Sequence, residues 1–180
     1  MNLPNILTLL RIALLPFFLF FLVGGNYGAA LIVFLIASIS DALDGFIARK
    51  FHQITEFGKF LDPAADKLFL LSTFITFYLL DLIPLWFFII GLAKDMVILS
   101  GSAVIYLKNV KFNIEPTFSG KVSTALQMAT VLLILFHGMN YITREILLAA
   151  MIATASILFY STLSYVIIGI RIYKGGHRIE

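Results

Sequence analysis

The chain has 180 residues, 61% of them hydrophobic, a mean hydropathy of +1.00 and a formal net charge of +3. Soluble domains hold about 45–50% apolar residues, and a chain of this size leaves about a third of its surface exposed, so the composition excludes an ordinary soluble protein. The absence of cysteine excludes disulfides and thiolate metal sites, and the small net charge gives no indication of nucleic-acid binding.

Six apolar runs predict helices long enough to span a bilayer. They cover about residues 4–23, 28–50, 61–82, 84–107, 118–136 and 145–173. Because the connections are short, we expect an all-α integral membrane protein with six transmembrane helices in one bundle, forming a single domain over residues 1–180. The N-terminus resembles a signal peptide in part, but its first residues include polar Asn2 and Asn5 rather than lysines, and the length of the apolar run favours a retained helix.

The basic residues indicate the orientation of these helices. The turns after the first, third and fifth helices contain no Lys or Arg. Basic residues gather instead around the connections after the second and fourth helices and at the C-terminal end: Arg49, Lys50, Lys59, Lys108, Lys111, Lys121, Arg171, Lys174 and Arg178. The positive-inside rule then predicts cytoplasmic termini in a multi-pass cell-membrane protein.

Four aspartates stand between the second and third apolar runs, namely Asp41, Asp44, Asp62 and Asp66. Asp41 and Asp44 are three residues apart, and Asp62 and Asp66 are four apart, so each pair shares a helix face. Carboxylates placed at mid-bilayer cost about 2.5–3.5 kcal/mol each, so such a cluster requires water, ion pairs or bound cations. Carboxylate oxygens suit Mg²⁺, and two metals suit displacement at phosphorus. The alternative is a solvated helix end paired with neighbouring lysines and arginines.

The pattern Asp41-x2-Asp44-Gly45-x2-Ala48-Arg49-x8-Gly58-x3-Asp62-x3-Asp66 resembles the signature of the CDP-alcohol phosphotransferase family. The opening PNILTLLR and the number of helices are similar as well. The resemblance implies a metal-dependent transferase that moves a phosphatidyl group from a CDP-linked lipid to an alcohol and releases CMP. It also implies a homodimer. By the positive-inside rule, we expect the aspartates to face the cytoplasm.

The resemblance further implies a role for each matching residue. Asp41, Asp44 and Asp62 would be ligands of Mg²⁺ or Mn²⁺, and we expect two ions. Asp66 would be both a ligand and the general base on the attacking hydroxyl. The CDP-lipid would be bound by Asn5, Thr8, Gly45, Arg49 and Thr55. For Arg11, interface anchoring and nucleotide contact remain open.

Within the family, the chain is most similar to bacterial phosphatidylglycerophosphate synthases, which implies sn-glycerol 3-phosphate as the acceptor. The residues expected to bind its phosphate are Lys94, Lys121 and Arg171. That branch usually carries a second lysine where this chain has Ser123. The acceptor of cardiolipin synthases, phosphatidylglycerol, is therefore an alternative, as are inositol phosphate and serine. A divalent-ion channel and an inactive scaffold are the non-catalytic alternatives.

Overall fold

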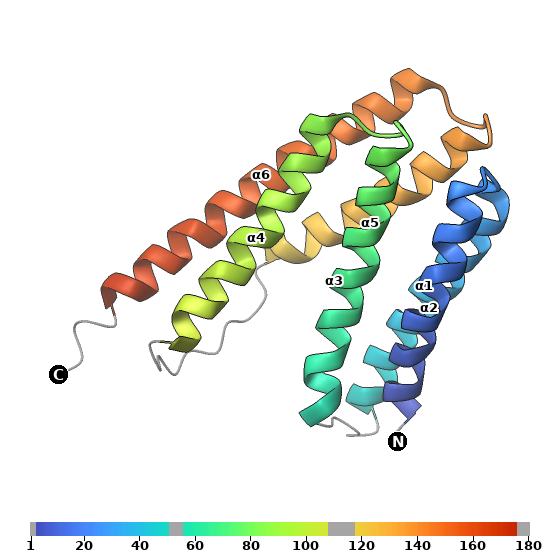
Figure 1. Ribbon diagram of the computed structural model, residues 1–180. Helices are drawn as coiled ribbons and strands as arrows, with labels where there is room; N and C mark the ends of the chain where they lie inside the picture. The colour runs from blue at the N-terminus through green and yellow to red at the C-terminus, as the bar shows by residue number, and fades with distance from the viewer. Residues whose placement is uncertain (1–2, 51–55, 108–117, 176–180) are drawn as a thin grey trace. The chain divides into compact units, whose positions relative to one another are not determined.

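The computed structural model describes the backbone of residues 3–50, 56–107 and 118–175, and the side chains of residues 6–41, 43, 65–98, 100 and 118–170. The described backbone forms six α-helices and no strand (Figure 1). They are α1 (Leu3–Val23), α2 (Tyr27–Lys50), α3 (Glu56–Leu79), α4 (Leu85–Leu107), α5 (Phe118–Gly138) and α6 (Arg144–Gly175). The predicted all-helical fold is therefore confirmed over these residues.

The largest difference from the predicted bounds is the start of α3, which begins at Glu56 rather than near residue 61. The prediction followed the apolar run, whereas the helix already includes the preceding segment EFGKF, which mixes charged and apolar residues. Asp62 therefore lies inside the helix rather than at its beginning.

The turns after α1, α3 and α5 share one geometry. Each contains one residue in the left-handed conformation: Gly25 (φ 70°), Asp81 (φ 56°) and Asn140 (φ 64°). Glycine adopts this conformation at no steric cost, and Asp and Asn tolerate it better than most residues. In each turn the next backbone N–H donates to a carbonyl in the last turn of the preceding helix: Asn26 to Phe21, Leu82 to Phe77 and Tyr141 to Phe136. These bonds end the three helices cleanly.

The chain divides into two compact units. The first contains Met1–Ile83 and Leu135–Tyr141, in which α1 packs against both α2 and α3 (Figure 1). Three buried phenylalanines, one from each helix, meet at its centre. The ring centroid of Phe18 lies 6.0 Å from that of Phe34 and 5.3 Å from that of Phe69. The distances suit attractive aromatic pairs, so this cluster fixes how the three helices face one another.

The second unit contains Pro84–Ile134 and Ile142–Glu180, and within it α4 packs against α6. Its buried apolar residues include Phe87, Val131, Ile134, Leu147, Met151, Ala155 and Leu158. Polar side chains are also buried here. Thr130 of α5 and Thr154 of α6 form a hydrogen bond of 2.9 Å between their hydroxyl oxygens.

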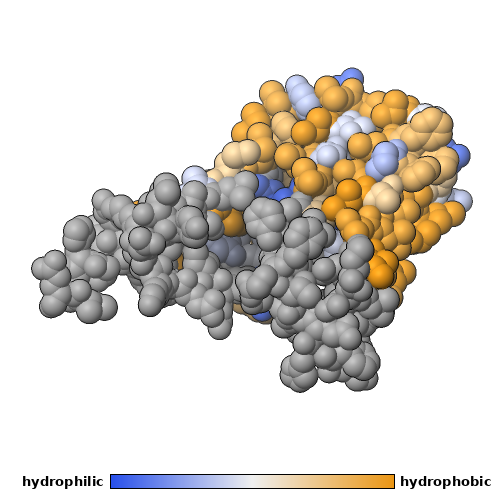
Figure 2. All heavy atoms as spheres, turned by 60° about the horizontal axis from the view of Figure 1, so that its bottom comes forward, coloured by the Kyte–Doolittle hydropathy of each residue, from blue (hydrophilic) through white to orange (hydrophobic). Residues whose placement is uncertain are grey.

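Large apolar side chains cover the outside of the helices, including Phe20, Leu79 and Phe159. Figure 2 shows hydrophobic residues over most of the coloured surface in that view. Among the described residues, three helical segments are long and apolar enough to cross a membrane: Ile6–Val23, Phe118–Gly138 and Arg144–Ile170. The apolar part of α2, Tyr27–Asp41, is shorter. The surface and these helices support a membrane protein, and six spans and a single domain remain predictions.

Candidate active site

The buried faces of α1, α2 and α3 each lead from the phenylalanine cluster to a charged residue. On α1 the residue is Arg11, on α2 it is Asp41 and on α3 it is Asp66. Each stands at helical spacing from its own phenylalanine, because Arg11 precedes Phe18 by two turns, Asp41 follows Phe34 by two turns and Asp66 precedes Phe69 by one. The same packing that aligns the aromatic rings therefore brings one arginine and two aspartates together.

Arg11 connects the two aspartates directly. Its side chain is only 3% exposed, and its Nη2 atom lies 2.6 Å from Asp41 Oδ1. Its Nη1 atom donates a hydrogen bond to Asp66 Oδ1. Hydrogen bonds between ionised partners are about twice as strong as neutral ones. The prediction that aspartates of the second and third helices converge is thus supported for Asp41 and Asp66.

The two carboxyl groups differ from Arg11 in their access to solvent. Asp41 is 31% exposed and Asp66 36% exposed, whereas the guanidinium that joins them is buried. One guanidinium carries a single positive charge, so by itself it does not neutralise both carboxylates. Partly exposed carboxylate oxygens are the donors that hard divalent cations bind. Asp41 and Asp66 therefore fit a metal site chemically.

The other predicted site residues of the first unit are described only in part. Thr8 is fully buried on α1, one turn before Arg11. Asn5 lies in α1, Asp44, Gly45 and Arg49 lie in α2, and Asp62 lies in α3, and their side chains are outside the described residues, as is all of Thr55. No group of three or more metal-binding side chains occurs within the described part of the chain. The predicted metal set of four aspartates therefore stays a prediction.

A second buried cation, Lys94 of α4, lies in the second unit. Lys94 is 1% exposed, and its Nζ atom donates hydrogen bonds to Gln127 Oε1 at 3.1 Å and to Thr124 Oγ1 at 3.4 Å. Both acceptors are on α5 and carry no charge. The sequence interpretation left open a cavity-facing position and a carboxylate partner, and neither anticipated these α5 partners.

The remaining acceptor-site predictions differ in exposure. Lys121 is exposed in the first turn of α5, and Arg171 belongs to α6 with its side chain outside the described residues. Ser123 is buried, and its hydroxyl donates to the carbonyl of Gly120 at 2.8 Å. A lysine at position 123 would have to enter the interior of the second unit, so serine there is consistent with local packing.

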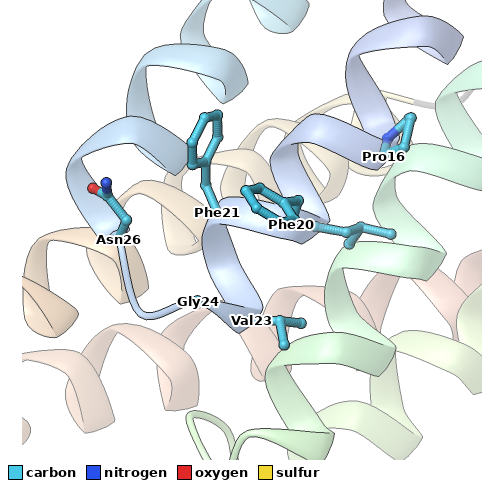
Figure 3. A pocket seen from close by; sticks show the side chains of 7 residues that line it. Pro16, Phe20, Phe21, Val23, Gly24 and Asn26 are labelled. Atoms are coloured by element: carbon cyan, nitrogen blue, oxygen red, sulfur yellow. The ribbon is translucent and has the colours of Figure 1, made fainter.

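An apolar pocket lies at the opposite end of α1 from Arg11 (Figure 3). It is lined by Pro16, Leu19, Phe20, Phe21, Val23, Gly24 and Asn26. The lining carries no ionisable side chain, and all of it comes from α1 and the turn that follows. This pocket can accept apolar groups and has no charged side chain for phosphate or metal, and it shares no residue with the charged cluster.

Residues 1–163 match the family profile described as CDP-alcohol phosphatidyltransferase. The chain belongs to this family. A CDP-diacylglycerol--glycerol-3-phosphate 3-phosphatidyltransferase of Aquifex aeolicus is 36% identical over 148 residues, covering 79% of this chain and 82% of the relative. The Bacillus subtilis protein of the same name is 33% identical over 161 residues, covering 78% and 79%. A cardiolipin synthase (CMP-forming) of Streptomyces coelicolor is 34% identical over 149 residues, covering 79% and 69%.

CDP-alcohol phosphatidyltransferases generally use divalent metal ions. The donors described here fit such an ion, because Asp41 and Asp66 offer oxygen ligands at one end of three packed helices. Sequence reasoning found both aspartates but gave Arg11 no place beside them. The signal for Arg11 was its position, because an arginine inside an apolar helix requires an anionic partner.

The hydrogen bonds of Lys94 to α5 predict that substitutions of Lys94 and Gln127 have coupled effects on the stability of the protein. Replacing Gln127 with leucine removes an oxygen that accepts a hydrogen bond from Lys94 Nζ, and we expect the protein to be destabilised by about 1–3 kcal/mol. The double variant Lys94→Met/Gln127→Leu should recover most of this loss, because replacing both partners by apolar groups is close to neutral. Thermal unfolding in detergent measures both effects. An unchanged melting temperature in Gln127→Leu would contradict the coupling.

Proposed function

We propose that this protein transfers the phosphatidyl group of CDP-diacylglycerol to sn-glycerol 3-phosphate, giving phosphatidylglycerophosphate and CMP. The observation that carries the proposal is the meeting of Asp41 and Asp66 at one guanidinium, since these are two of the four aspartates on which the family resemblance rests. The relatives from Aquifex aeolicus and Bacillus subtilis carry the name of this activity.

A second acceptor, phosphatidylglycerol, is favoured by two specific observations. The Streptomyces coelicolor relative is named a cardiolipin synthase and is 34% identical, which is within the range of the other relatives. Ser123 is buried and bonded within its own helix, so it offers no cation to a phosphate. Glycerol 3-phosphate remains the first choice. The matches to the two relatives named for that acceptor cover 82% and 79% of the relatives' length, compared with 69% for the cardiolipin synthase.

The proposed chemistry is an attack by the acceptor hydroxyl on the phosphorus of the phosphatidyl group. A bond forms between the hydroxyl oxygen and phosphorus, the bond from phosphorus to CMP breaks, and Asp66 accepts the hydroxyl proton. Asp41, Asp44, Asp62 and Asp66 would hold two Mg²⁺ or Mn²⁺ ions. When bound, such ions neutralise the diphosphate and the charge that develops on CMP.

The binding roles proposed for the other residues rest on the family resemblance, and their chemistry is consistent with it. Arg49 would bridge phosphate oxygens of the CDP-lipid with its fork of donors, supported by Asn5, Thr8, Gly45 and Thr55. Lys121 is exposed and would bind the phosphate of the acceptor together with Arg171. Lys94 has the charge to contribute, but a phosphate would have to compete with Gln127 and Thr124 for its Nζ protons.

We also propose the arrangement of the protein in the membrane. The six helices would each cross the bilayer, with both termini and the aspartates on the cytoplasmic side of the cell membrane and two copies forming a homodimer. The distribution of Lys and Arg supports this orientation. It would let a water-soluble acceptor meet a lipid whose acyl chains stay in the bilayer.

The proposed reaction predicts CMP release by purified protein supplied with CDP-diacylglycerol, Mg²⁺ and glycerol 3-phosphate. Release should stop when EDTA removes the metal and should be far slower with phosphatidylglycerol as the acceptor. Release with phosphatidylglycerol alone would assign the second function instead. No CMP with either acceptor, nor with inositol phosphate or serine, would contradict the activity and favour a channel or a scaffold.

The base assignment predicts a large effect of Asp66→Asn. General-base catalysis contributes about 10²–10⁴-fold to rate, so turnover should fall by at least about 100-fold while CDP-diacylglycerol still binds. Asp81→Asn is a matched control, because Asp81 is exposed in the turn after α3 and asparagine tolerates its positive φ. A rate for Asp66→Asn close to that of the Asp81→Asn control would show that another group is the base.

A further inference from the structure

Arg11 has contacts that the proposed chemistry does not use. It is the buried member of the charged cluster, and it reaches Asp41 and Asp66 with different nitrogens. The two aspartates lie on different helices, and α1 is the element that packs against both. The guanidinium therefore joins α2 to α3 through α1 at the end where the carboxylates are exposed.

The shape of the guanidinium matters to this contact. It is planar, and its two terminal nitrogens project in fixed directions, so their two partners are held in a defined relation to each other. A lysine ammonium carries the same charge but is a compact point donor on a flexible stem. Charge alone would neutralise the aspartates, whereas the fork also sets the separation and orientation of their carboxyl groups.

The phenylalanine cluster supports a geometric role for Arg11. Phe18 lies two turns from Arg11 on the same buried face of α1 and contacts Phe34 of α2 and Phe69 of α3. Phe18 connects α1 to α2 and α3 through aromatic contacts. Arg11 connects the same three helices through its contacts with carboxylates. The aromatic layer fixes the helices, and the guanidinium layer fixes the carboxyl groups at their ends.

We propose that Arg11 is a positioning residue that orients Asp41 and Asp66 for binding a divalent cation. The inference rests on the proposed function, because it takes the aspartates as metal ligands. Partners that orient metal ligands change metal affinity by about 10–100-fold when they are altered. Arg11 would therefore act on metal affinity through the carboxylates rather than through contact with a substrate.

The test measures Mn²⁺ binding to the purified protein in detergent by electron paramagnetic resonance, without any substrate. Arg11→Lys keeps the charge and removes the fork, so we expect Mn²⁺ binding at least about tenfold weaker than in the wild type. Arg144→Lys is the matched control, because Arg144 is exposed at the start of α6, and it should bind Mn²⁺ like the wild type. Equal affinity in Arg11→Lys and the wild type would overturn the proposal.

If Arg11→Lys does not fold, a second variant tests the positioning role of Arg11. Arg11→Gln removes a positive charge from the cluster, which by charge alone should make Mn²⁺ bind more tightly. Loss of orientation should make it bind more weakly. Weaker binding by folded Arg11→Gln therefore supports positioning, and tighter binding overturns it. Thermal unfolding of each variant shows that the compared proteins are folded.

Asp41→Asn separates failure of this inference from failure of the proposed function. This variant removes a ligand and should lose most Mn²⁺ binding. If Asp41→Asn binds Mn²⁺ like the wild type, the proposed metal site itself is wrong. If Asp41→Asn loses binding while Arg11→Lys keeps it, the metal site stands and only the positioning role of Arg11 fails.

Discussion

The contact between the buried guanidinium of Arg11 and the carboxylates of Asp41 and Asp66 is the constraint on which the site depends. A charge placed in an apolar interior costs several kcal/mol unless it is paired and hydrogen-bonded. Arg11 can therefore occupy its position on α1 only if α2 and α3 present their aspartates to it. The need to pair Arg11 therefore fixes how α1, α2 and α3 are aligned along their axes, and it brings Asp41 and Asp66 together.

The second unit contains a buried cation of a different kind. Lys94 donates to the neutral oxygens of Gln127 and Thr124, whereas Arg11 contacts carboxylates. The carboxylates of Asp41 and Asp66 are partly exposed, whereas Arg11 is buried. The two contacts of Lys94 to α5 involve neutral oxygens and connect α4 to α5.

The helices were predictable from sequence because a bilayer demands long apolar runs and internally satisfied backbone groups. The convergence of Asp41 and Asp66 was predictable as well, since helical spacing places each aspartate on a defined face. The start of α3 was not, because residues 56–60 mix Glu56, Gly58 and Lys59 with two phenylalanines and precede the apolar run that marked the helix. Hydropathy cannot predict how far a helix continues beyond its apolar run.

The partners of the two buried cations were also beyond the sequence. Arg11 and Asp66 are 55 residues apart, and Lys94 and Gln127 are 33 apart. Spacing along one helix cannot show which residue of another helix will face it. An intramembrane charge indicates that a partner exists, but the packing of α1 on α2 and α3 decides which residue it is.

The central claim is that Asp41 and Asp66 hold divalent metal at the end of the three packed helices. Anomalous diffraction from crystals grown with Mn²⁺ tests it most directly. The account predicts anomalous density within coordination distance of carboxylate oxygens from both Asp41 and Asp66. Manganese bound elsewhere in the protein, with no density at these two carboxylates, would contradict it.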